Sequence, residues 1–175
     1  MVKANEIPVA NTPPGGWRGE MPPPVLAGCT EPLHPDAPDL RGLWQVGRVE
    51  RDGQVLTDHR LNEHVERIEQ CGDRVVVTSE GVIHDMRADG TLENGVNDVA
   101  GPDLTQPIRV AAAFNEGRLD LHPFGVQAGK PPGNARDRGW HDGLALRPVQ
   151  GDDATSGQRV RSHRGGKGKA GLWKY

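Results

Sequence analysis

His84 is the residue whose predicted surroundings best suit acid–base chemistry. It lies in the middle of Val82 to Arg87, a short run typical of a strand, on a face that we expect to point inward. A neutral imidazole in an apolar cavity can donate and accept protons near pH 7. Glu93 and Asn97 fall on the same predicted face, so the predicted catalytic group is His84, Asn97 and Glu93. The competing interpretation is a core histidine that bonds to a backbone carbonyl or to Asn97.

Two other histidines stand near carboxylates. His64 and Glu66 share one face of their predicted strand, but the turn at residues 71–73 leaves open whether that face points inward or to solvent. Asp120 and His122 also share a face, and we expect that face to point outward. Neither pair is therefore placed in the predicted catalytic group.

The elements that must position these residues are short strands joined by tight turns, between residues 62 and 99. Acidic–glycine pairs separate runs rich in β-branched residues, and glycine supplies the positive φ that tight hairpins need. A two-residue loop at 80–81 pairs Val77 with His84. A second hairpin turn after residue 87 would place Gly95 opposite His84, which would leave space beside the imidazole.

Alternation along these strands divides their side chains between two faces. The face opposite His84 carries Asp85 and Arg87, which we expect to form an ion pair at the surface. The face shared with His84 is poorer in charge, and we take it as the wall of an internal cavity. The predicted ligand-binding residues are Val75, Val77, Ser79, Val82, Met86, His64, Phe114 and Trp140.

Further strands are expected at residues 43–50, 107–114, 118–124 and 143–149. A two-residue loop at 116–117 would set Phe114 opposite Leu119 and turn His122 outward, whereas a three-residue loop would turn His122 toward Val110. We favour the first register because it collects a clean apolar face. The long segment 125–142 reads as a loop, and Trp140 near its end could cap the mouth of a cavity.

About eight short strands with little helical periodicity predict an all-β fold, a single antiparallel up-and-down β-barrel. Closure of a barrel also removes the strand edges that a meander would expose. The 175 residues include 36 Val, Leu, Ile and Phe, and 28 of these fall within residues 40–150. We therefore expect a barrel domain at 40–150, an extended or disordered arm at 1–39 and a basic flexible tail at 151–175.

Several classes of function are disfavoured. The net charge of −3 argues against a nucleic-acid-binding domain, and no apolar run is long enough for a membrane helix, so we expect a cytoplasmic protein. Cys29 and Cys71 form neither a metal-binding spacing nor a disulfide framework. The lipobox-like residues 26–29 follow a proline-rich segment rather than an apolar leader. With no phosphate-binding loop and no dinucleotide fingerprint, we expect no cofactor and no metal.

The first and last predicted strands resemble those of a known group. Gly42-Leu43-Trp44 resembles the Gly-x-Trp that opens the first strand of lipocalins and the wider calycin group, and Arg147 stands where many members carry an arginine late in the last strand. The resemblance implies a lipocalin-like barrel closed at its base by a cation–π contact between Trp44 and Arg147. More distantly, the chain resembles the small cofactor-free β-barrel cyclases of bacterial polyketide biosynthesis.

These observations predict a cofactor-independent enzyme, a cyclase, isomerase or lyase, acting on an apolar small molecule inside the barrel. Catalysis would combine folding of the substrate with hydrogen bonding to a carbonyl. Ser79 and Asn97 would serve as the polar anchors. The alternative is a non-catalytic carrier or sensor of a hydrophobic ligand, and a structural interaction module comes third.

Overall fold

The computed structural model describes residues 1–51, 54–58, 62, 64–79, 81–101, 103–124, 142–148 and 172–173. The regular elements of this part of the chain are strands and one short 3-10 helix, η1 (Ala4–Glu6). The strands are β1 (Gly42–Arg51), β2 (Gln54–Val55), β3 (Val65–Cys71), β4 (Arg74–Ser79), β5 (Val82–Arg87), β6 (Val96–Ala100), β7 (Asp103–Asn115), β8 (Arg118–Pro123), β9 (Asp142–Pro148) and β10 (Leu172–Trp173). All of their pairings are antiparallel, so the predicted all-β class is confirmed.

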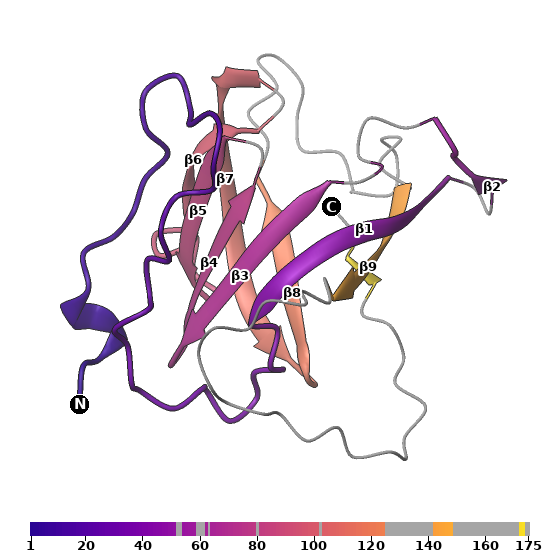
Figure 1. Ribbon diagram of the computed structural model, residues 1–175. Coiled ribbons are helices and arrows are strands. Elements are labelled where there is room, and N and C mark those ends of the chain that lie inside the picture. Colours follow the sequence, from indigo (N-terminus) through magenta and orange to yellow (C-terminus); the bar gives the residue numbers. More distant parts are fainter. Residues whose placement is uncertain are drawn as a thin grey trace.

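The strands form two sheets that share a core (Figure 1). One sheet has seven strands in the order β10-β9-β1-β3-β4-β5, with β2 paired to β1, and the other has three in the order β6-β7-β8. The chain leaves the first sheet after β5, where the sequence predicted another hairpin. Val96 of β6 instead pairs with Val110 of β7, so the predicted pairing of His84 with Gly95 is wrong.

The segment between β5 and β6 closes on itself, which explains the change of sheet. The Arg87 amide donates to the Asn94 carbonyl at 2.8 Å, and the Asp89 carboxylate accepts from the Asn94 side chain at 2.6 Å. Burial acts to raise the pKa of Asp89, but hydrogen bonds from Asn94 and Thr91 outweigh it and hold the pKa below its ordinary value. The Gly90 amide donates to a β7 carbonyl at 2.7 Å, so the turn delivers the chain to the second sheet.

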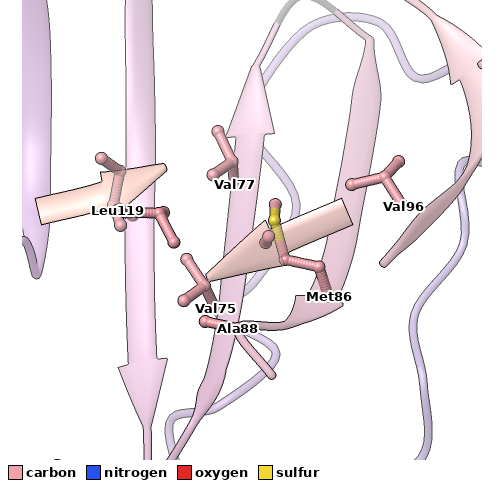
Figure 2. Close-up of a cluster of buried hydrophobic side chains, with 8 residues drawn as sticks. Val75, Val77, Met86, Ala88, Val96 and Leu119 are labelled. Carbon is pink, nitrogen blue, oxygen red and sulfur yellow. The ribbon is translucent and has the colours of Figure 1, made fainter. Parts of the chain in front are cut away.

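The core lies between the inner faces of the two sheets (Figure 2). Apolar side chains from β3, β4 and β5 meet apolar side chains from β6, β7 and β8, because alternate residues of each strand point inward. Burial of each Val, Leu, Ile or Met side chain among them contributes about 1.5–3 kcal/mol to stability. The buried members are Ile68, Val75, Val77, Met86, Ala88, Val96, Ala112 and Leu119.

Two hairpin registers agree with the prediction. In the β4–β5 hairpin Val77 pairs with His84, as a two-residue loop at 80–81 requires. In the β7–β8 hairpin Phe114 pairs with Leu119, which is the favoured of the two registers considered. Glu116 and Gly117 both have positive φ, 49° and 71°, as a tight hairpin loop of this length needs.

The arm, residues 1–39, is extended and packs along the outer face of β3, β4 and β5 (Figure 1). Leu26 and Ala4 of the arm are buried against Val76 and Ile83 of the sheet. Polar side chains of the sheet hold the backbone of the arm. The Glu69 carboxylate, for example, accepts from the amides of residues 25 and 26 at 3.1 and 2.7 Å. The arm is thus an integral part of the described fold.

Arg74 is the most completely bonded of the side chains that hold the arm. Its five N–H groups donate to the Asp85 carboxylate and to three backbone carbonyls of the arm, those of residues 4, 7 and 8. Both side chains of the Arg74–Asp85 pair are 3% exposed. The predicted surface pair of Asp85 with Arg87 is therefore wrong, and Arg87 pairs with Asp73 instead.

A disulfide joins Cys29 of the arm to Cys71 at the end of β3. The expectation that the two cysteines form no disulfide framework is therefore wrong; 42 residues separate them, and no spacing pattern marks such a pair. Their Cα atoms lie 6.2 Å apart, within the range of protein disulfides. Cys29 is thereby assigned to a structural bond within the lipobox-like residues 26–29.

We predict that Cys29→Ser lowers the free energy of unfolding of the oxidised protein by about 2–4 kcal/mol, because the disulfide closes a long loop in the unfolded chain. Denaturant unfolding of both proteins without reductant, with a chelator present, measures this difference. Ala27→Ser, at an exposed position of the same segment, is the control and should stay within about 0.5 kcal/mol of the parent. Equal stability of Cys29→Ser and the parent would contradict the assignment.

Within the described residues, no helix has the length and apolar character needed to cross a membrane.

Candidate functional site

The inner face of the first sheet carries a group of polar side chains beside its apolar cluster. Ile68 of β3 lies in the core, and Glu66, two residues earlier, shares its face. Trp44 of β1 pairs with Glu66, and the β3–β4 register, in which residue 67 pairs with 78, brings Ser79 beside Glu66. His64 precedes Glu66 by two residues on the same face. We call His64, Glu66, Ser79 and Trp44 the inner polar cluster.

His64 and Glu66 form a buried hydrogen-bonded pair within this cluster. His64 Nε2 lies 3.0 Å from Glu66 Oε1, and the two side chains are only 7% and 10% exposed. The His64 carbonyl accepts the Val46 amide at 2.8 Å, which fixes the backbone at the start of β3. The orientation that the sequence left open is therefore inward. A carboxylate beside an imidazole fixes its tautomer and stabilises the imidazolium when a proton is taken up.

Trp44 closes one side of the cluster. Its ring packs against the core, and its Nε1 donates to the Leu40 carbonyl at 2.7 Å. The predicted contact with Arg147 finds no support in the strand register, because Trp44 pairs with Pro148 and Arg147 pairs with Gln45. The side chain of Arg147 lies outside the described part of the chain, so the cation–π contact stays a prediction.

His84 makes the kind of backbone contact that was the alternative to a catalytic role. Its Nε2 lies 3.0 Å from the Val99 carbonyl of β6, and its side chain is half-buried at the junction of the two sheets. This is the backbone-bonded histidine of the competing interpretation. The contact ties β5 to β6 on the side where the chain changes sheets.

The other two predicted catalytic residues do not join His84 on an inner face. Asn97 and Glu93 are exposed, so the predicted inward orientation is wrong. The Asn97 amide donates to the carbonyls of residues 92, 93 and 95, and its oxygen accepts Arg109 Nε at 3.0 Å. The reversal follows from the turn after β5, which puts Val96 rather than Asn97 on the core side.

Asn97, Glu93 and Met86 instead line a cleft of about 310 Å³ between the arm and the edge of β5. Arg74 and Asp85 also line it, but their polar atoms bond to each other and to the arm. The cleft is therefore a surface groove of the arm–sheet junction.

Most of the remaining predicted ligand-binding residues are buried packing residues. Val75, Val77 and Met86 are buried members of the apolar cluster between the sheets. Val82 is buried, and its carbonyl accepts Trp17 Nε1 of the arm at 3.3 Å. Phe114 stacks on the His34 ring at a centroid distance of 5.9 Å. His122 is exposed, as predicted, and Trp140 lies outside the described residues.

Comparison with known proteins gives one partial relative. Argininosuccinate lyase of Mycobacteroides abscessus is 34% identical to the chain over 109 residues, which are 57% of this chain and 23% of the lyase. No protein-family model matches the chain, and no solved structure matches it. The chain spans less than a quarter of the length of that lyase, so the match does not place it in a family.

Of the residues that the sequence offered for chemistry, the structure brings together His64, Glu66 and Ser79. The signal for the first pair was present in their spacing of two within a strand, which puts both on one face. The missing information was the direction of that face, since the turn at residues 71–73 did not fix it. The β1–β3 register supplies this direction by pairing Glu66 with the core-facing Trp44.

Proposed function

We propose that the protein binds an apolar small molecule between its two sheets and transforms it without a cofactor, with His64 and Glu66 as the acid–base pair. The observation that carries the proposal is the buried His64–Glu66 hydrogen bond beside the apolar cluster of the inner face. Buried pairs of hydrogen-bonded titratable groups are often found at functional sites. The reaction class is that predicted from the sequence, a cyclisation, isomerisation or lyase-type elimination.

We also propose that the two sheets close into one barrel. Three contacts support closure on the β5–β6 side: the His84–Val99 hydrogen bond, the Gly90–Ala112 backbone hydrogen bond and the isolated bridge between Asp89 and Ala113. A barrel would have an interior for one small ligand, and the inner polar cluster would hold the reacting group.

The proposed chemistry follows from the groups in the inner polar cluster. His64 would take a proton from the substrate or return one, while Glu66 holds the ring and stabilises its charged form. The Ser79 hydroxyl could bond to a carbonyl oxygen on which negative charge develops. Trp44 and the neighbouring core side chains would hold the apolar part of the substrate in a reactive shape.

The first experiment identifies the bound molecule. Native mass spectrometry of the protein purified from its producing cells, followed by extraction under denaturing conditions, should give one apolar compound at a stoichiometry of about one. Precursors of that compound then serve as substrates in a turnover assay. The proposal would be overturned if the protein purified from these cells carried no ligand and also bound nothing from an apolar extract of the same cells.

We predict that His64→Gln lowers turnover at least about 100-fold while ligand affinity changes little, because the acid–base group is lost and the apolar contacts remain. His122→Gln, an exposed position on the outer face, is the matched control and should keep full turnover. Thermal unfolding of both variants shows whether the fold is intact. If His64→Gln weakens binding and no substrate is turned over by the parent, the protein is the alternative carrier rather than an enzyme.

A further inference from the structure

Three potential metal ligands meet where the arm crosses the end of β3. They are Cys29 and Glu31 of the arm and Cys71 of the sheet, and one ligand atom of each lies within 4.8 Å of the others. Cys71 is buried, whereas Cys29 and Glu31 are half-buried, so the group is accessible from solvent on the arm side. Their convergence depends on the arm, which places residues 40 or more positions from Cys71 beside it.

The Glu31 carboxylate is held in this place by its surroundings. Its Oε2 accepts the Ala4 amide at 2.9 Å. A Cβ atom at position 72 would lie 3.0 Å from the Glu31 carboxyl carbon, so Gly72 leaves the space that the carboxylate occupies. Gly72 also has a φ of +58°, a conformation that favours glycine at this turn. One oxygen of the carboxylate is thus held within 4.8 Å of the two sulfur atoms.

We propose that Cys29, Cys71 and Glu31 bind Zn²⁺ when the disulfide is reduced. Two thiolates and a carboxylate are ligands that zinc accepts in tetrahedral sites, with water in the fourth position. Cysteine pairs of proteins in reducing compartments are more often metal ligands than disulfides, and the sequence predicts a cytoplasmic protein. The oxidised and reduced forms would then hold the arm in two different ways.

A dithiol reductant supplies two electrons and two protons, the S–S bond breaks to give two thiols, and the reductant becomes a disulfide. Zinc binding then releases both thiol protons, because the thiolate is the ligand. In the disulfide-bonded structure each sulfur lies 3.5 Å from a backbone carbonyl oxygen, Val2 O for Cys29 and Glu31 O for Cys71.

The site would keep the arm in place without the disulfide. Both the S–S bond and a bound ion join the arm to β3 at the same point, beside the buried cluster that contains Leu26, Val76 and Ile83. Reduction without metal removes this link. The zinc site would therefore preserve the cover over the outer face of the sheet in a reducing compartment.

The test uses the full chain reduced with a phosphine, which competes poorly for metal, and titrated with Co²⁺ as a spectroscopic probe. We expect a thiolate-to-cobalt charge-transfer band that saturates at one ion per chain and disappears when Zn²⁺ is added. The oxidised protein should show no such band. Its absence from the reduced parent protein, with the fold retained by circular dichroism, would overturn the proposal.

Two variants test the ligand set. Cys29→Ser should abolish the charge-transfer band typical of two thiolates, and Glu31→Gln should weaken Zn²⁺ binding at least about tenfold while its amide oxygen still accepts the Ala4 amide. Glu20→Gln, an exposed acidic residue of the same arm, is the matched control and should bind as the parent does. Parent-like zinc affinity of Glu31→Gln would overturn the role of the carboxylate, and a parent-like band in Cys29→Ser would overturn the site.

Discussion

Arg74→Met is expected to lower the free energy of unfolding by about 3–5 kcal/mol, because it removes one partner of a buried charge pair. The Asp85 carboxylate would remain in a site where it is 3% exposed, with only the Ala10 amide at 2.9 Å as a donor among the described residues. The carbonyls of residues 4, 7 and 8 would lose their guanidinium donor as well. In the folded protein each of these groups is removed from water and depends on the guanidinium for a hydrogen bond, so its loss leaves the group unsatisfied.

Lysine at position 74 should rescue little of this loss. The guanidinium uses all five of its donors in a planar arrangement, two toward Asp85 and three toward the arm, and an ammonium has three donors on one nitrogen. Arg118→Met is the matched control, since Arg118 is 65% exposed and lies 4.0 Å from its acidic neighbour. It should change stability by less than about 0.5 kcal/mol.

Urea unfolding followed by circular dichroism measures the three variants, and limited proteolysis reports the arm. We expect cleavage within residues 1–28 to become faster in Arg74→Met, because that segment loses its central anchor. A loss of less than about 1 kcal/mol, or an arm as resistant as in the parent, would show that the other contacts of the arm suffice without Arg74.

The registers of two hairpins could be predicted because their turns are defined by local chemistry. At residues 80–81 and 116–117 an acidic residue and a glycine permit a two-residue loop, and loop length then determines which residues pair. Alternation assigns the faces from there, so the exposure of His122 and the core position of Val77 followed directly. In these hairpins, residues that are close in sequence determine both the strand pairing and the face on which each side chain lies.

The change of sheet after β5 could not be predicted in the same way. The residues after Arg87 have the composition of an ordinary hairpin turn, but Asp89 bonds within the turn and the Gly90 amide bonds to β7. The second contact joins residues far apart in sequence, which no local pattern encodes. Because side chains alternate, this single change moved Asn97 from the predicted inner face to the surface.

The role of the arm was hidden for a different reason. Its residues have few periodic apolar positions, and prolines prevent it from pairing as a regular strand. The arm is recognised instead through its backbone, by Glu69, Arg74 and Asp85 of the sheet. Of these three residues only Asp85 was assigned in advance to the outer face, and it was expected to meet solvent there. Alternation along a strand indicates on which face of the sheet a side chain lies, but it does not indicate whether solvent or another segment covers that face.

Gly95→Ala is expected to lower the free energy of unfolding by about 3 kcal/mol or more, because a methyl group has no room between two backbones. A Cβ atom at position 95 would overlap the Val110 carbonyl oxygen and would lie 2.9 Å from the Val110 carbonyl carbon and 3.0 Å from the Ala111 Cα. All three atoms belong to the backbone of β7, so no side-chain rotation can relieve the overlap. Gly95 was predicted to lie beside His84, whereas the close neighbour of Gly95 is strand β7 of the second sheet.

The expected loss reflects separation of the chain from β7 at the start of β6, where Val96 pairs with Val110. Gly28→Ala is the matched control, because a Cβ there meets no atom within 4 Å and its φ is not in the left-handed region. That variant should lie within about 0.5 kcal/mol of the parent. Amide hydrogen exchange distinguishes the cause: in Gly95→Ala the amides of β6 and β7 should lose protection before those of β3 and β4. Uniform loss of protection in both sheets would instead indicate that the substitution acts on the whole fold, and unchanged stability would show that the close approach of position 95 to β7 does not exist in solution.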